Sequence, residues 1–132
     1  MNLRPINPNF AASAAPAAGA GERPAISLQQ LECLFANIRA RTSWNVDGEL
    51  LWSYYFFDTS RERLGALGGH LTAEGYNPIG IHPVGQGLLR LHVERIEHHT
   101  PDSLHRRNAE FHRLAEACGV GSYDGMEVAP LQ

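Results

Sequence analysis

The sequence contains no lysine, so all eleven of its basic residues are arginine, against fourteen acidic residues and a formal net charge of −3. Arginines and carboxylates are interspersed along the chain instead of forming a basic stripe, which disfavours nucleic acid as a partner. No run approaches the roughly 18–20 apolar residues of a membrane-spanning helix, and the start lacks the apolar segment of an export signal. We therefore expect a soluble, cytoplasmic protein that does not contact a membrane.

Catalytic motifs are also missing from the chain. It has no Gly-x-Ser-x-Gly elbow, His-Glu-x-x-His pair, phosphate-binding loop or Gly-x-Gly-x-x-Gly turn. Its two cysteines, Cys33 and Cys118, lie far apart without Cys-x-x-Cys spacing, so we expect free thiols. Cys118 is expected on the buried face of its helix, where a thiol behaves as a small hydrophobe. The sequence thus predicts a protein that is not an enzyme and has no cofactor.

The seven histidines are the remaining candidates for chemistry, and their spacing does not favour a metal site. Histidines that share one ion on a helix stand three or four residues apart, whereas His105 and His112 lie about 10 Å apart along the axis. His98 and His99 are neighbours in sequence, whose side chains usually point apart. We expect no metal at these residues or at the other histidines, which are His70, His82 and His92.

Residues 1–25 differ in composition from the rest of the chain. They contain four of the eight prolines amid alanine and glycine. Such a segment buries too little apolar surface to offset the entropy lost on ordering, so we expect a flexible tail. We expect the remainder, residues 26–132, to form a single domain.

The periodicity of apolar residues assigns an element to most of this domain. Ser27 is expected to cap a helix over residues 27–41, and Thr59 to open a capping box for a second helix. Residues 50–57 are apolar on both faces, as in a central strand. The remaining elements are strands at residues 76–84, 87–96 and 123–128, and a helix that starts at Thr100.

From residue 50 the order is strand, helix, strand, strand, helix, strand. This order predicts an α+β protein with the ferredoxin-like split βαβ arrangement (βαββαβ). Its four-stranded antiparallel sheet would carry two helices on one face, with the N-terminal helix as an addition. In residues 87–96, Leu89, Leu91 and Val93 alternate with Arg90, His92 and Glu94, so we expect the first set to face the helices.

The second face of such a sheet needs a cover or a use. Depending on the register of the first strand, it receives either Trp52, Tyr54 and Phe56 or Leu51, Tyr55 and Phe57, flanked by His82, Arg90, His92 and Glu94. Three occupants remain open at this point: the N-terminal helix, a second copy in a homodimer, or a partner protein.

The segment Gly121-Ser-Tyr-Asp-Gly-Met-Glu-Val128 follows the last amphipathic helix directly. Its Tyr-Asp-Gly run resembles the C-terminal signature of the RraB family, the regulators of ribonuclease E activity. That family's run reads Tyr-Asp-Gly-Trp, and Met126 stands here at the tryptophan position. The resemblance covers roughly residues 50–130. It implies the ferredoxin-like fold and a non-enzymatic protein that binds a ribonuclease of the RNase E type and lowers its activity.

The same resemblance directs attention to the last strand as a binding surface. We expect a partner interface at Tyr123, Asp124 and Met126, joined by Arg90 and His92 from the neighbouring part of the sheet. The alternative is that Tyr-Asp-Gly only shapes a bend or bulge at the start of an edge strand. Two other functions stay open: an immunity-type protein that neutralises a dedicated toxin, and a dimeric module that senses a small molecule.

If residues 1–25 form a tail, deleting them should leave the melting temperature almost unchanged. Thermal unfolding of the full chain and of the truncated chain, followed by circular dichroism, measures this. A fall of many degrees would show that the segment packs against the domain.

Overall fold

The computed structural model describes residues 25–131, so the expected tail lies outside the described residues except for Ala25. The sequence-based boundaries of the elements agree closely with the structure. In chain order the elements are α2 (Leu28–Arg41), β1 (Glu49–Asp58), α3 (Arg61–Ala73), β2 (Asn77–Gly85), β3 (Leu88–His98), α4 (Pro101–Ala117) and β4 (Ser122–Ala129).

The four strands form one antiparallel sheet in the order β2-β3-β1-β4. β1 pairs with β3 on one side and with β4 on the other, so it is the central strand that its apolar sequence predicted. Because β3 is antiparallel to both β1 and β2, these two strands run parallel on either side of it. The expected α+β class and the four-stranded antiparallel sheet are confirmed.

Side-chain caps start the helices where the sequence placed them, with one shift. Ser27 and Thr100 cap α2 and α4, each in a reciprocal capping box. For α3 the expected cap was Thr59, but Ser60 performs this role, since its hydroxyl accepts the backbone N–H of Arg63 at 3.1 Å. Each cap satisfies a backbone donor that the first helical turn leaves without a partner.

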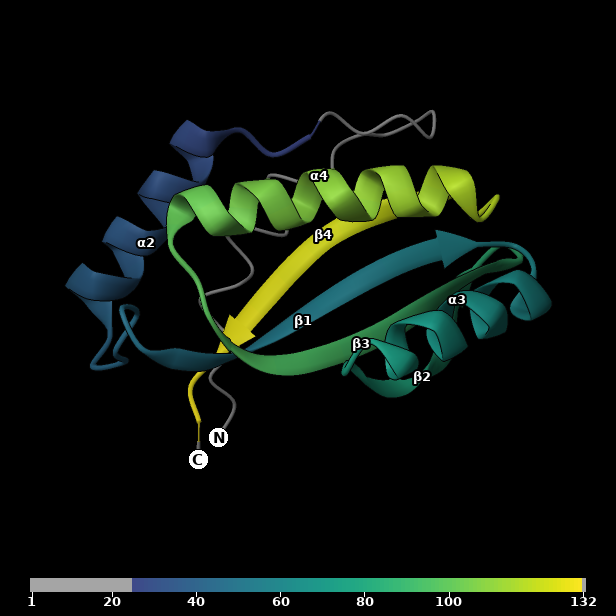
Figure 1. Ribbon diagram of the computed structural model, residues 1–132, viewed down its shortest axis with the longest axis horizontal. Coiled ribbons are helices and arrows are strands. Elements are labelled where there is room, and N and C mark those ends of the chain that lie inside the picture. The colour runs from purple at the N-terminus through teal and green to yellow at the C-terminus, as the bar shows by residue number, and fades with distance from the viewer. Residues whose placement is uncertain (1–24, 132) are drawn as a thin grey trace.

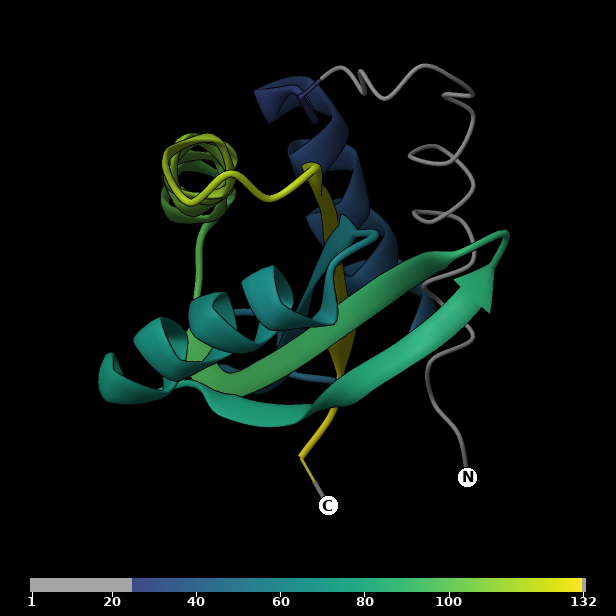
Figure 2. The same ribbon diagram turned by 90° about the vertical axis from the view of Figure 1, so that its right-hand side faces the viewer.

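The core lies between the sheet and the helices. Trp52, Tyr54 and Phe56 of β1 are at most 1% exposed, and the last two contact the ring of Phe111 in α4 at 5.0 and 5.3 Å. Figures 1 and 2 show α3 and α4 over one face of the sheet, with α2 beside the start of α4. Hydrophobic burial of this kind is the main favourable term in folding.

The N-terminal helix does not cover the second face of the sheet. Phe35 of α2 stacks on Trp52 at 6.0 Å between ring centroids, and Trp52 lies on the same face of β1 as Tyr54 and Phe56. The side on which α2 packs is therefore the side of α3 and α4. The apolar stripe of α2 extends the existing core, and the idea that it closes the other face is wrong.

The alternation in β3 has the expected phase. Leu91 and Val93 are 2% and 0% exposed and belong to the core, and Leu89 packs against it. Arg90, opposite Phe57 in the register, points to the other face. The hairpin from β2 to β3 also matches its sequence signal, because Gly85, Gln86 and Gly87 all have positive φ.

Both cysteines are free and exposed. Free thiols were expected, but the exposure of Cys118 contradicts its expected place on the buried face of the helix. α4 ends at Ala117, and the thiol lies at the cap, beyond the last turn that packs on the sheet. Among residues 25–131, no helix combines the length and the apolar character that crossing a bilayer requires.

The β3 register makes a prediction about stability. Leu91→Ala should lower the free energy of unfolding by roughly 2–5 kcal/mol, because it leaves a cavity in the core. Arg90→Ala, on the other face, should change it by no more than about 1 kcal/mol. Urea unfolding of both variants measures the difference, and the reverse ranking would contradict the face assignment.

Candidate functional site

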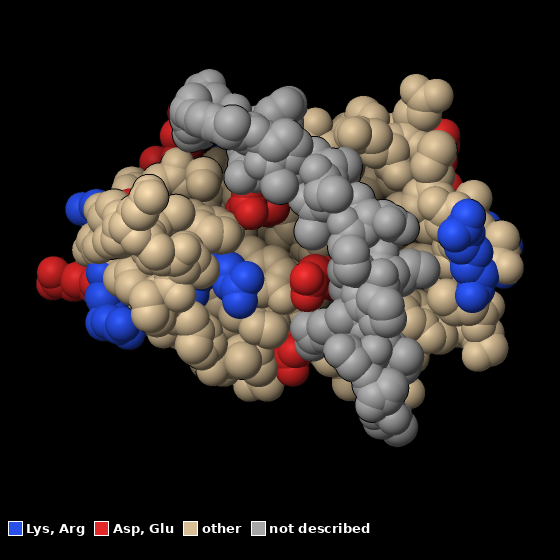
Figure 3. All heavy atoms as spheres, turned by 180° about the vertical axis from the view of Figure 1, so that it is seen from behind, with Lys and Arg blue, Asp and Glu red and all other residues tan. Residues whose placement is uncertain are grey.

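One face of the sheet carries none of the three described helices, and we call it the open face. The strand register places on it alternate residues of each strand. Figure 3 views the molecule from behind and shows acidic side chains in the middle of this side. The open face consists of Leu51, Ser53, Tyr55 and Phe57 of β1, His82 of β2, Arg90, His92 and Glu94 of β3, and Asp124 and Glu127 of β4.

Tyr55 is the centre of this face and organises its neighbours. Its ring lies 4.7 Å from the ring of His92, and the guanidinium of Arg90 lies 4.7 Å from the ring centroid. Its hydroxyl donates a hydrogen bond of 2.7 Å to Glu127 Oε1 across the β1–β4 pair. Tyr55 is 8% exposed, so a buried aromatic ring positions both a cation and a carboxylate.

The charges of the open face are mainly negative. Glu94, Asp124 and Glu127 supply three carboxylates, and Arg90 supplies the one guanidinium among the described residues of this face. His92 Nε2 lies 3.8 Å from Glu94 Oε1, a contact that is an ion pair only when the imidazole is protonated. This arrangement suits the recognition of a cationic group.

The structure brings three of the five expected interface residues together. Arg90, His92 and Asp124 all lie on the open face. The expectation is wrong for the other two side chains, because Tyr123 and Met126 are 1% and 2% exposed and point into the core. An aromatic or thioether side chain in β4 is more stable against α4 than in water, and this burial decides its direction.

A bulge in β4 explains why Tyr123 and Met126, three positions apart, both face the core. Tyr54 pairs with Met126 but Phe56 pairs with Tyr123, so β4 places two residues opposite the single residue Tyr55. One of the two is Gly125, with φ +106°, a conformation that side chains with a Cβ rarely adopt. The Tyr-Asp-Gly run therefore shapes a bulge in β4.

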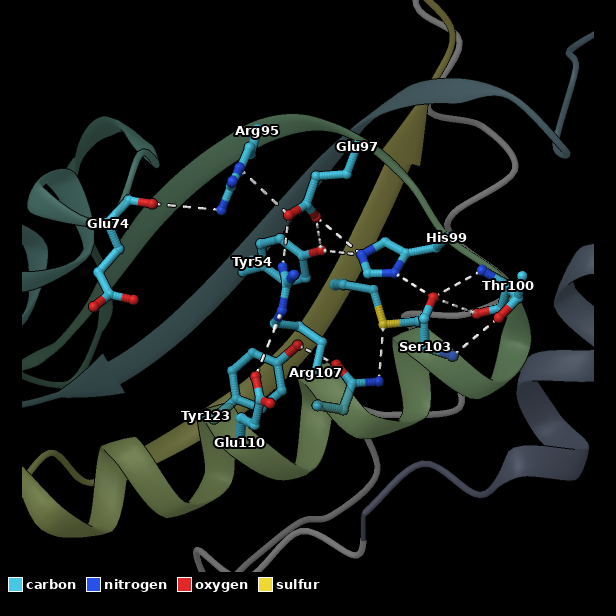
Figure 4. Close-up of polar contacts among 12 residues, drawn as sticks. Tyr54, Glu74, Arg95, Glu97, His99, Thr100, Ser103, Arg107, Glu110 and Tyr123 are labelled. Carbon is cyan, nitrogen blue, oxygen red and sulfur yellow. Dashed lines mark hydrogen bonds and ion pairs between the residues drawn. The ribbon is translucent and has the colours of Figure 1, made fainter.

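A second polar group lies on the helix side, buried between the sheet and α4 (Figure 4). The carboxylate of Glu97 in β3 is at its centre. One oxygen accepts a hydrogen bond of 2.6 Å from the hydroxyl of Tyr54, and the other accepts one of 2.6 Å from Arg107 Nη1. His99 Nε2 lies 2.9 Å from the first oxygen.

This group is tied to the start and the middle of α4. His99 Nδ1 lies 2.9 Å from the hydroxyl of Ser103, which also accepts the backbone N–H of Thr100 at 2.8 Å. Further along the helix, the hydroxyl of Tyr123 donates to the side-chain carbonyl of Asn108. The buried polar groups thus bond to one another and attach α4 to three strands, which is a structural role.

The electrostatics of this group follow from its contacts. Burial alone would raise the pKa of the Glu97 carboxyl, but hydrogen bonds from His99, Tyr54 and Arg107 outweigh burial and lower it to about 2. Burial raises the pKa of the Tyr54 hydroxyl, and the adjacent Glu97 charge adds to this. Glu97 is therefore an anion held by donors, and Tyr54 stays neutral.

Sequence reasoning missed this group, although a signal existed. The alternation of Leu89, Leu91 and Val93 continues to Arg95 and Glu97, which predicts that both point inward. Among the described residues, no three His, Cys, Asp or Glu side chains gather in a way that could hold a metal ion.

The sequence was compared with protein-family models, with curated proteins and with solved structures. Residues 30–128 match the model described as "RraB: Regulator of ribonuclease activity B". This chain belongs to the RraB family. The searches of curated proteins and of solved structures gave no match. The RraB match begins within α2, earlier than the resemblance at roughly residues 50–130, and it extends to Val128 near the end of β4.

The buried carboxylate of this RraB protein predicts sensitivity to acid. Because the folded-state pKa of Glu97, about 2, lies below its usual value of 4.5, its contribution to stability is complete above about pH 5. It is lost as the pH falls from about 4.5 to about 2. Glu97→Gln should lower the free energy of unfolding by about 2–4 kcal/mol at neutral pH and reduce its decline across that window.

Urea unfolding at several pH values measures both effects. The matched control is Glu110→Gln on α4, whose side chain is 59% exposed and which should change stability little. Part of the acid sensitivity that remains in Glu97→Gln comes from Asp58. Burial would raise the pKa of the Asp58 carboxyl, but hydrogen bonds from Arg63 and from the backbone lower it. An unchanged pH profile would show that Glu97 is not held as an anion in the folded state.

Proposed function

We propose that this protein is a non-enzymatic cytoplasmic regulator that binds a ribonuclease of the RNase E type and lowers its activity. The observation that carries the proposal is the family match, which spans every described helix and strand at least in part. The family description names ribonuclease activity, and this favours a ribonuclease over a dedicated toxin as the partner. We also propose that the fold is ferredoxin-like, because β1 and β2 run parallel on either side of β3.

The open face is the surface we propose for the partner. On the helix side, Tyr54, Glu97 and Arg107 bond to one another and are occupied in holding α4. The open face combines aromatic rings with carboxylates on paired strands. Aromatic anchors surrounded by polar groups are typical of protein interfaces. A rigid sheet also presents such side chains with little loss of entropy on binding.

An inhibition assay tests the function. The full chain should slow the cleavage of a labelled RNA by a purified RNase E-type ribonuclease, with one chain bound per site and no turnover. Asp124→Ala should weaken inhibition at least about tenfold while melting stays unchanged, because it removes an open-face charge without altering the core. Glu116→Ala, an exposed carboxylate on α4, is the matched control and should inhibit normally.

Met126→Ala separates an interface from a structural role. Because Met126 is 2% exposed, this variant should lose roughly 2–5 kcal/mol of stability and regain inhibition at low temperature. Absence of both binding and inhibition by the folded wild-type chain would contradict the proposed function.

A further inference from the structure

We propose that Arg95 and Arg107 form a binding site for the phosphate group of a small phosphorylated molecule, on the helix side of the sheet. Arg95 of β3 lies opposite Trp52 of β1 in the register, and Trp52 faces the helices. Arg107 comes from α4, so the two arginines approach from different elements (Figure 4). This site lies across the sheet from the surface proposed for the partner, and it does not depend on the proposed function.

Both guanidiniums meet at the carboxylate of Glu97. Arg107 Nη1 lies 2.6 Å from Glu97 Oε2, and Arg95 Nε lies 3.6 Å from the same oxygen. The central carbons of the Arg95 and Arg107 guanidiniums also lie 4.8 and 5.7 Å from the ring centroid of Tyr76. Two like charges at this separation repel each other, and a single carboxylate neutralises one of them. The cluster therefore holds a positive charge that Glu97 does not balance.

Arg95 is held more loosely than Arg107. It lies 3.6 Å from Glu97, and its Nη1 donates over 3.5 Å to the backbone carbonyl of Glu74. Both distances are longer than the roughly 2.9 Å of a well-formed hydrogen bond. The side chain of Arg95 is 40% exposed and that of Arg107 is 22% exposed. Since a guanidinium has five N–H donors, both arginines have donors left for a ligand that arrives from solvent.

The chemistry of the pair favours a phosphate over a carboxylate. The fork of an arginine matches both kinds of anion. A phosphate monoester, however, carries a charge of about −1.5 to −2 at neutral pH and three strong acceptor oxygens. It can therefore reach both guanidiniums and compensate the charge that Glu97 leaves, whereas a carboxylate has one charge and two oxygens.

The surroundings favour a single phosphate over a nucleic-acid strand. Glu110 Oε1 lies 3.7 Å from Arg107 Nε, on the α4 side of the cluster. On the α3 side, the carboxylate of Glu74 lies 4.0 Å from His70 Nε2. A strand would bring its next phosphates toward these two carboxylates, and like charges repel. A small molecule with one phosphate avoids this repulsion.

NMR titration of the isotope-labelled full chain, in a chloride buffer of constant ionic strength, tests the proposal. The probes are inorganic phosphate and ribose 5-phosphate. Both should shift the side-chain Nε signals of Arg95 and Arg107 along a saturating curve. Sodium acetate should bind at least about tenfold more weakly, because it has less charge and fewer acceptors.

Three variants locate the site. Arg95→Gln should bind both probes at least about tenfold more weakly, because it removes the more exposed charge. The matched control Arg113→Gln removes the same charge from an exposed position of α4 and should bind within about twofold of wild type. Glu110→Gln should bind about two- to threefold more tightly, because it removes a carboxylate that competes for Arg107. Thermal unfolding of each variant checks that it is folded.

Several results would overturn the proposal. Equal weakening in Arg95→Gln and Arg113→Gln would show general attraction of an anion to arginine, and equal binding of phosphate and acetate would show no selection for phosphate. Binding of inorganic phosphate without ribose 5-phosphate would exclude a phosphorylated molecule. Tighter binding of single-stranded hexauridylate than of ribose 5-phosphate at these arginines would make a nucleic-acid strand the ligand. If Arg95→Gln does not fold, Glu110→Gln decides, and an unchanged affinity in that variant contradicts the site.

Discussion

The packing of the even-numbered aromatic side chains of β1 against α4 is the contact on which the other features depend. Tyr54 and Phe56 meet Phe111, and two positions earlier Trp52 receives Phe35 of α2. β1 is also paired on both edges, so the same strand holds the sheet together and fixes the helices above it. Because a strand alternates, this packing commits the odd-numbered side chains of β1 to the other face.

Much of this architecture could be predicted because it depends on short-range periodicity. The phase of Leu91 and the central position of β1 follow from alternation alone. The place of α2 does not, since its apolar stripe shows that one side is buried but not against which surface. Tyr-Asp-Gly indicated a bend or bulge, but the residues of β4 that this bulge turns inward depend on the pairing of β4 with β1 and not on local sequence. The sequence therefore predicted Tyr123 at the surface, whereas the structure buries it.

The glutamates on the two faces of the sheet show how the surroundings determine the role of a residue type. Glu97 is surrounded by donors on the helix side, and its charge is neutralised inside the protein by Arg107. Breaking such a buried arrangement costs stability, so its residues serve the fold. Among the described residues of the open face, three carboxylates accompany one guanidinium, and the Tyr55 hydroxyl orients Glu127.

The bulge in β4 acts as a phase shift in the alternation of that strand. With the extra residue, Tyr123 and Met126 both face the core although they are three positions apart, and Glu127 returns to the open face. Removing one residue here would turn Met126 outward and drive Glu127 under α4. The length of this segment is therefore more constrained than the identity of its side chains. A substitution in β4 changes one side chain at a time, whereas a single-residue insertion or deletion would exchange the two faces at once.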